Sequence, residues 1–395
     1  MDKIKIITNI CLIIALYYLT YHTYLGLLNP IPALGDSWDY HIPISQSILN
    51  GSFLNPSHFT KEQYFAQLNP GSSEAINSLF IILHIPLTIS NLFAAIVLFF
   101  CLWKLALIFR LKNYFALLFA LTFSTLNVII RWLNSVSIDI WVAVFFTLAI
   151  ILLEDPKKNI RYFAKVGFVL GMLVGSKYSG LTILLILLIA YGKKLLEAVT
   201  ISRFIVLLMP FSIFGLFWYI RNYLAVGNPL WPFCLISLPC KAIYYNNHVQ
   251  MWNAAISHPI VMLDALFSEY KLWSFSLLIP FFVIYLILRK KLTFSSKISV
   301  LCFIGVANLI FFSIYPTSYE PWVMVSSFRY SYSIFIPLLV AVFLLAEKYQ
   351  KEKLIGYFAI ANMINVLSMA YYPKLILIYL PLSLLAFYYI NKKWA

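Results

Sequence analysis

Long apolar runs separated by short polar segments dominate this chain. A helix that crosses a bilayer needs about 20 mostly apolar residues, and several runs reach or approach that length. Reading the apolar runs between charged clusters predicts about twelve spans, which makes the expected fold an all-α polytopic membrane protein. The predicted spans cover residues 6–27, 80–103, 113–130, 136–153, 163–176, 179–192, 204–222, 272–288, 298–315, 330–346, 354–371 and 375–390.

The composition excludes an ordinary soluble domain. Hydrophobic residues make up 62% of the 395-residue chain and charged residues 11%, whereas soluble domains carry about 25% charged residues. The first run follows Lys3 and Lys5 as in a signal peptide. Because no small-residue cleavage site follows it, we expect an uncleaved anchor. We treat residues 1–395 as a single membrane domain, with no soluble carboxy-terminal domain after the last span.

The positive charges that give the chain its net charge of +15 follow the predicted membrane topology. Lysine and arginine collect in alternate loops, and the positive-inside rule assigns those loops and both termini to the cytoplasm. We therefore expect a multi-pass membrane protein with membrane lipids around it, and no nucleic-acid partner. The cytoplasmic set is Lys3, Lys5, Lys104, Arg110, Lys112, Lys157, Lys158, Arg161, Lys165, Lys193, Lys194, Arg203, Arg289, Lys290, Lys291, Lys297, Lys348, Lys351, Lys353, Lys392 and Lys393.

The chain outside the membrane is concentrated in two outward segments, residues 28–79 and 223–271. Short interfacial helices are expected at 41–49 and 60–68, and Met251, Trp252, Ala255 and Ile256 fall at helical spacing in the second segment. The cytoplasmic loops are short and contain no G-x-x-x-x-G-K-[ST] pattern, so nothing supports ATP-driven transport.

Cysteine usage is informative in one place. Cys234 and Cys240 share the second outward segment, where an oxidising compartment permits a disulfide. Their spacing leaves open whether they are bridged, because bridge geometry cannot be deduced from sequence. Cys11, Cys101 and Cys302 lie within predicted spans and are interpreted as packing residues.

Several charged residues lie near the outer ends of spans, where placing a charge close to the membrane interior costs free energy. Asp139 lies in "NSVSIDIWVAVFF", Lys177 in "GMLVGSKYSGL" and Arg329 in "FRYSYSIFIPLL". Ionisable groups at membrane depth mark either function or a paired structural site. Carboxylates and cations close to lipid suit chemistry on a lipid-linked phosphate, because Arg and Lys bind phosphate and a carboxylate acts as general base on a hydroxyl. A saccharide on polyprenyl phosphate is such a substrate.

Six motifs, in order along the chain, resemble those of the GT-C superfamily of integral-membrane glycosyltransferases. The similar members are bacterial relatives of the protein O-mannosyltransferases and the lipid A aminoarabinose transferases. The motifs are "GDSWDYHIP", "NPGSSEAINSLF", "NSVSIDIWVAVFFTLAI", "GSKYSGL", "WYIRNYLAVGNPLWPF" and "FRYSYSIFIPLL". Each motif is weak alone, whereas six in order on the expected side of the membrane are more specific.

The resemblance implies an inverting transfer of a sugar from polyprenyl phosphate to a glycan, lipid or protein acceptor on the outer face. It assigns Asp36 as the catalytic general base. The acceptor or donor site would include Asp39, Tyr40, His41, Glu74 and Asp139. The phosphate leaving group would be held by Lys177, Arg221 and Arg329.

The resemblance leaves alternatives open. No cofactor is required, but Asp36 and Asp39 form D-x-x-D, and their i, i+3 spacing would let them share a divalent cation on one helical face. Asp39 is equally interpreted as an acid that satisfies the start of a helix, and His41 as a residue that caps a turn. Two rival functions are a polymerase or ligase of lipid-linked glycans and a lipid or glycan transporter.

Overall fold

The structure is a computed structural model of the chain, and it is mostly helical. It describes residues 2–30, 37–54, 68–155, 159–233, 238–239, 249–262, 269, 295–317, 323 and 326–367. Within them, five helices are long and apolar enough to cross a bilayer, as expected for an all-α membrane protein. They are Lys3–Leu28, Leu87–Ile108, Ser179–Leu196, Ile201–Val226 and Ser296–Ser313.

Each predicted run that falls on described residues overlaps a helix, whereas the runs at 272–288 and 375–390 lie outside the described residues. The longer helices are α1 (Asp2–Leu28), α5 (Ser90–Ile108), α6 (Asn113–Ser124), α8 (Asp139–Glu154), α9 (Ile160–Ser176), α10 (Ser179–Leu196), α11 (Ile201–Phe211), α12 (Phe217–Val226), α17 (Ser296–Ser313), α19 (Tyr332–Lys348) and α20 (Glu352–Leu367). A π-helix, η5 (Ser212–Leu216), joins α11 to α12. The shorter elements are the π-helix η1 (Ser37–His41), the helices α2 (Ile42–Asn50), α4 (Ser72–Ile82), α7 (Asn127–Ile130) and α14 (Met251–Ser257), the 3₁₀ turns η2 (Ser52–Leu54), η4 (Leu87–Ile89) and η6 (Phe328–Tyr330), and the strands β1 (Val249–Gln250) and β2 (Pro316–Thr317).

The predicted second span, 80–103, is wrong in its bounds. Helix α4 ends at Ile82, a turn follows, and α5 continues to Ile108. His84 has a φ of 53°, in the left-handed region, and Pro86 provides no backbone N–H and disfavours helix at the residue before it. The third predicted span, 113–130, is likewise divided between α6 and α7.

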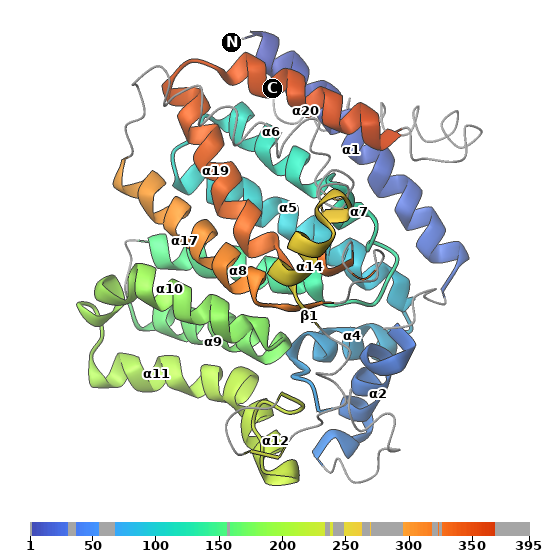
Figure 1. Cartoon of the computed structure of the whole chain (residues 1–395), viewed down its shortest axis with the longest axis vertical. Helices are drawn as coiled ribbons and strands as arrows, with labels where there is room; N and C mark the ends of the chain where they lie inside the picture. Colours follow the sequence, from blue (N-terminus) through green and yellow to red (C-terminus); the bar gives the residue numbers. More distant parts are fainter. Residues whose placement is uncertain are drawn as a thin grey trace.

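Helices α8 and α19 are among the most buried helices of the bundle that Figure 1 shows. Most of the side chains of both are buried, on every face of the helix, as expected for a helix that other helices surround. Aromatic rings fill the space between α6 and α19. The ring centroid of Phe343 lies 4.7 Å from that of Phe115 and 5.3 Å from that of Phe119.

A glycine stripe brings α9 close to α11 and η5. A Cβ added at Gly167 would lie 2.0 Å from the Leu207 carbonyl oxygen, and one at Gly175 would lie 1.8 Å from that of Phe214. Gly171 faces Gly215 in the same interface. Small residues four positions apart allow helix backbones to approach this closely, so the stripe fixes the distance between the two helices.

Charged pairs join loops at the end of the bundle where the basic residues collect. Lys112 Nζ lies 3.4 Å from Glu352 Oε1 and 3.5 Å from Glu347 Oε1. The hydrogen bond to Glu352 raises the pKa of Lys112, and the charge of Glu347 adds to this effect. Lys194 and Glu154 form a further pair at 3.6 Å. These contacts connect loops that the charge pattern assigns to one side of the membrane.

The outward segments are partly described. Residues 41–49 are helical, as predicted, in η1 and α2, while most of 60–68 lies outside the described residues. Helix α14 covers the predicted helical positions at 251–256. Strands β1 and β2 pair antiparallel over two residues, Val249 with Thr317 and Gln250 with Pro316, which ties the second outward segment to the end of α17.

Candidate functional site

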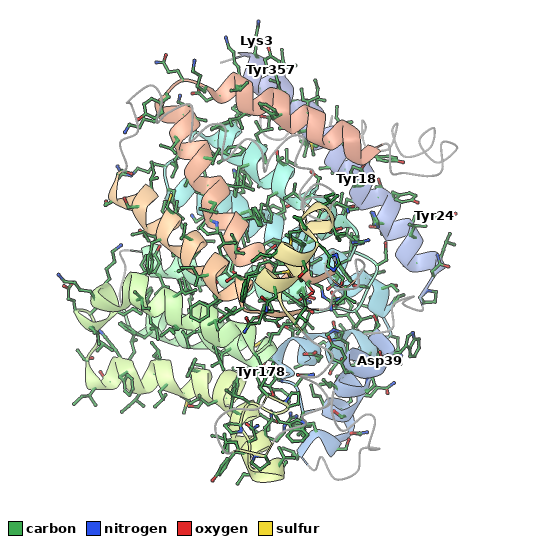
Figure 2. All side chains as sticks on the ribbon, viewed as in Figure 1. Lys3, Tyr18, Tyr24, Asp39, Tyr178 and Tyr357 are labelled. Carbon is green, nitrogen blue, oxygen red and sulfur yellow. The ribbon has the colours of Figure 1, made fainter. Side chains whose placement is uncertain are left out.

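The segments that carry the six motifs meet at the end of the bundle opposite the basic loops. Ser73 Oγ lies 2.6 Å from Ser176 Oγ, which joins the start of α4 to the end of α9. The Trp218 indole donates to Ser72 Oγ at 2.6 Å, which joins α12 to the same turn. Figure 2 shows Asp39 and Tyr178 together in the lower part of the view, with Lys3 at the top. The motifs thus form one polar, largely buried region.

His41 and Glu74 form a buried pair in this region. His41 Nδ1 lies 2.9 Å from Glu74 Oε1, and the two side chains are each 1% exposed. His41 is the last residue of the π-helix η1, and Glu74 lies in the first turn of α4. π-helical turns occur frequently at functional sites. The second oxygen of Glu74, Oε2, is buried without a hydrogen-bond partner in the described part of the chain.

The neighbours of His41 differ in their surroundings. Asp39 is exposed, in the first turn of η1. The Tyr40 ring lies beside the His41 ring, with 4.0 Å between centroids. Asp36, the predicted general base, lies outside the described residues. The same holds for Cys234 and Cys240, so the predicted base and the predicted bridge both stay predictions.

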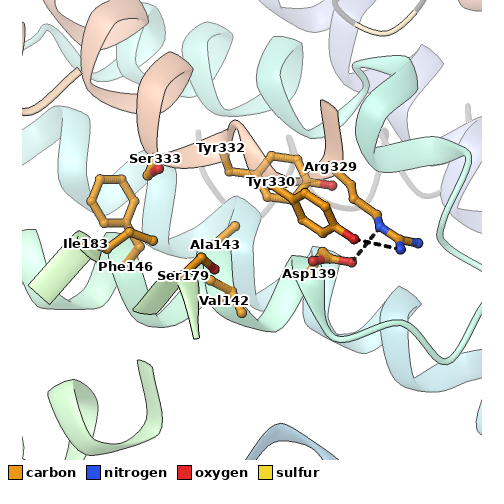
Figure 3. Close-up of a pocket in the computed structure, with 10 residues that line it drawn as sticks. All are labelled: Asp139, Val142, Ala143, Phe146, Ser179, Ile183, Arg329, Tyr330, Tyr332 and Ser333. Atoms are coloured by element: carbon orange, nitrogen blue, oxygen red, sulfur yellow. Dashed lines mark hydrogen bonds and ion pairs between the residues drawn. The ribbon is translucent and has the colours of Figure 1, made fainter. Parts of the chain in front are cut away.

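Asp139 holds two of the three predicted phosphate ligands. Lys177 Nζ donates to Asp139 Oδ1 at 2.7 Å. Arg329 Nε lies 3.4 Å from Asp139 Oδ2, and this pair is drawn in Figure 3. The three residues come from the start of α8, the end of α9 and η6. Their side chains are 4%, 16% and 8% exposed, respectively. Among the described residues, the two cations and one carboxylate of this cluster sum to one positive charge.

Aromatic rings hold both cations in place. Lys177 Nζ lies 3.7 Å from the centroid of the Tyr330 ring. The Arg329 guanidinium lies 4.6 Å from the centroid of the Trp132 ring and donates to the Tyr330 hydroxyl at 2.9 Å. Cation–π contacts of this kind stabilise partly desolvated charges. Tyr330 therefore contacts both cations of the cluster.

A small cavity of about 10 Å³ adjoins the cluster between α8, α10 and α19. Figure 3 shows Asp139, Arg329 and Tyr330 at one end of this cavity, with Ser333 and Phe146 toward the other. Its volume is comparable to the space that one water molecule requires. A ligand as large as a sugar phosphate therefore has to approach the cluster from outside the cavity, where Lys177 is the most exposed of the three charged side chains.

Arg221, the third predicted phosphate ligand, belongs to a second polar group. Its guanidinium donates to Asn222 Oδ1 at 2.8 Å and to the Asn69 carbonyl at 3.2 Å, and it lies over the Trp218 ring. Asn222 in turn donates to the Tyr178 hydroxyl at 3.0 Å. Because Tyr178 follows Lys177 in the chain, the two polar groups adjoin at the turn between α9 and α10.

Several residues of this region were not predicted from the sequence. Asn222, Trp132 and Tyr330 contact the predicted residues directly. Tyr178 accepts a hydrogen bond from Asn222. Three of them lie within quoted motifs: Tyr178, Asn222 and Tyr330 directly follow Lys177, Arg221 and Arg329, respectively. Adjacency in the motif is therefore the signal that could have identified them, whereas Trp132 lies outside the quoted motifs.

The described residues do not form a metal centre. No group of three or more His, Cys, Asp or Glu side chains among them is placed to hold an ion. Since Asp36 is outside the described residues, the predicted cation pair of Asp36 and Asp39 is not tested by this geometry.

Comparison with known proteins does not assign the chain to a family. No protein-family model, curated protein or solved structure matches the chain.

Proposed function

We propose that this protein is a membrane glycosyltransferase of the GT-C type. It would transfer a sugar from a polyprenyl phosphate to an acceptor hydroxyl at the outer face of the bacterial cytoplasmic membrane. The single observation that carries the proposal is the cluster in which Asp139 holds Lys177 and Arg329 at the end of the bundle opposite the basic loops. The meeting of the motif segments in the same region supports it.

The surplus positive charge of the cluster suits a phosphate leaving group. Arg and Lys form charge-assisted hydrogen bonds to phosphate oxygens, and fixed cations stabilise the charge that develops on the leaving oxygen. Asp139 keeps both cations together. Lys177, at 16% exposure, is the side chain that reaches the ligand first.

The chemical step assigned to Asp36 follows from the resemblance. The Asp36 carboxylate takes the proton of the acceptor hydroxyl while that oxygen attacks the anomeric carbon. The bond from this carbon to the phosphate oxygen breaks, the configuration inverts, and polyprenyl phosphate leaves with the electron pair. No cofactor takes part in this step. The buried pair of His41 and Glu74 would fix the chain a few residues after Asp36.

The proposed topology has twelve spans, with the basic loops and both termini in the cytoplasm. The Lys112 and Lys194 pairs support this arrangement because they connect loops of the same predicted side. The donor is then a lipid of the bilayer, and the acceptor is a glycan, lipid or protein outside the cell membrane.

The proposal is tested with the purified protein in vesicles that contain a radiolabelled polyprenyl-phosphate sugar. Incubation with a crude envelope acceptor should release the label from the carrier, and Asp36→Asn should abolish the release. Glu197→Gln, which changes an exposed acid at the basic-loop end of the bundle, should keep most of it. Movement of the intact carrier between leaflets without loss of label would instead identify a transporter.

A further inference from the structure

An open groove runs along the bundle between α1, α5 and α6. Its volume is about 980 Å³, near the upper end of the range for pockets that bind small molecules. Leu12, Leu16 and Leu19 of α1 line one wall, and Phe99 and Phe100 of α5 line another. Phe100 is 55% exposed, so the groove is open along its side to the surroundings of the bundle.

The groove is somewhat longer than one leaflet of a bilayer, so it can accommodate an acyl chain of that leaflet. Its lining on α1 extends from Lys5 to Leu19, which corresponds to roughly 21 Å at the rise of an α-helix. The hydrocarbon core of a bilayer is about 30 Å thick, so a single leaflet contributes about half of that. The groove is therefore long enough for an acyl chain whose headgroup lies near Lys5.

Polar groups collect at one end of this groove. Lys5 is the one charged side chain among the described residues that line it, and Asn9 and Asn113 lie toward the same end. The Lys5 ammonium lies 5.5 Å from the centroid of the Tyr114 ring, and the Trp103 indole donates to Asn113 Oδ1 at 3.1 Å. Tryptophan and tyrosine are enriched at headgroup level, where a basic side chain attracts anionic lipid.

We propose that the groove binds one anionic glycerophospholipid, with an acyl chain along α1 and α5 and its phosphate at Lys5. The single cation at the polar end complements an anionic headgroup, and the apolar lining accommodates the chain. The polar end of this lipid site lies at the basic-loop ends of the helices. The site does not depend on the proposed transferase activity.

The role of the Lys5 charge at the polar end of the groove is tested with the full-length protein. The micelles contain phosphatidylglycerol and phosphatidylcholine with the same acyl chains. Native mass spectrometry measures which lipid the protein retains. The wild-type protein should retain one phosphatidylglycerol in preference to phosphatidylcholine. Lys5→Gln should lower that preference about fivefold, which corresponds to the roughly 1 kcal/mol expected for one basic side chain near an anionic surface. Lys3→Gln removes the same charge two residues away, outside the groove lining, and should change the preference less than twofold.

The groove itself is tested by filling it. Ala15→Phe should abolish retention of the lipid, while Val306→Phe, at a position of α17 that is 50% exposed, should leave it unchanged. Ala95→Leu, on the α5 side of the groove, repeats the test if Ala15→Phe does not yield a monodisperse protein. Equal losses in Lys5→Gln and Lys3→Gln, or full lipid retention in a monodisperse groove-filling variant, would overturn the proposal.

Discussion

Asp139 accepts a hydrogen bond of 2.7 Å from Lys177 within a site where both side chains are largely buried. The two residues are the first of α8 and the one that follows α9, so the pair joins two neighbouring helices. Because Arg329 contacts the second carboxylate oxygen, removal of the carboxylate would leave two cations without their shared counter-ion.

We expect Asp139→Asn to destabilise the protein by about 3–5 kcal/mol, the cost of breaking a buried ion pair from one side. The matched change, Glu347→Gln, weakens a pair with Lys112, whose side chain is 71% exposed, and should cost about 1 kcal/mol or less. Denaturant titration in a fixed detergent compares the two. Equal effects would mean that the Asp139 pair contributes no more than a surface pair.

Loss of Glu74 should be costly for a different reason. Glu74→Ala leaves the buried His41 ring without its partner, and an unsatisfied buried group costs about 1–3 kcal/mol. Asp39→Ala, at an exposed position of the same region, should change the free energy of unfolding by about 0.5 kcal/mol or less. The same titration measures both, and an effect of Glu74→Ala no larger than that of Asp39→Ala would contradict the buried pair.

The glycine stripe gives a test of the packing between α9 and α11. Gly167→Ala places a methyl group 2.0 Å from the Leu207 carbonyl oxygen, which forces the helices apart and should cost about 1–3 kcal/mol or more. Gly192→Ala in α10 meets no atom within 4 Å and should stabilise the protein by up to about 1 kcal/mol through helix propensity. Thermal unfolding of the two variants should shift in opposite directions; a neutral Gly167→Ala would refute the close approach.

The proposed topology predicts which exposed positions a membrane-impermeant reagent reaches. In a background without native cysteines, Asp39→Cys should react with an impermeant maleimide in intact cells. Lys112→Cys, at the basic-loop end and also exposed, should react only after the membrane is permeabilised. The reverse pattern would place the motif region in the cytoplasm.

Much of the helical fold could be predicted because apolar runs are long and charges mark their ends. The break before α5 was missed because Ile85 and Pro86 continue the apolar character of the run, although the proline was a visible signal. The side chains proposed to hold phosphate could be identified by residue type, since charges at membrane depth are unusual.

Their partners could not be predicted. Asp139 and Arg329 are far apart in the chain, and only the packing of α8 against α19 brings them together. The sequence likewise grouped Arg221 with Lys177, whereas the contacts of Arg221 to Asn69 and Asn222 place it in the adjoining polar group. Such pairings depend on the order in which helices pack, which periodicity does not encode.

The central claim is that the cluster at Asp139 recognises a lipid-linked phosphate. The most direct measurement is the affinity of the protein, in lipid nanodiscs, for a polyprenyl phosphate and for the polyprenol of the same length. The wild-type protein should bind the phosphate at least tenfold more tightly, because charge-assisted hydrogen bonds contribute about 1.5–3 kcal/mol. Lys177→Gln should remove most of that preference, while Lys104→Gln, an exposed lysine of α5 at the basic-loop end, should keep it. Equal affinity of the wild-type protein for phosphate and alcohol, or an undiminished preference in Lys177→Gln, would contradict the claim.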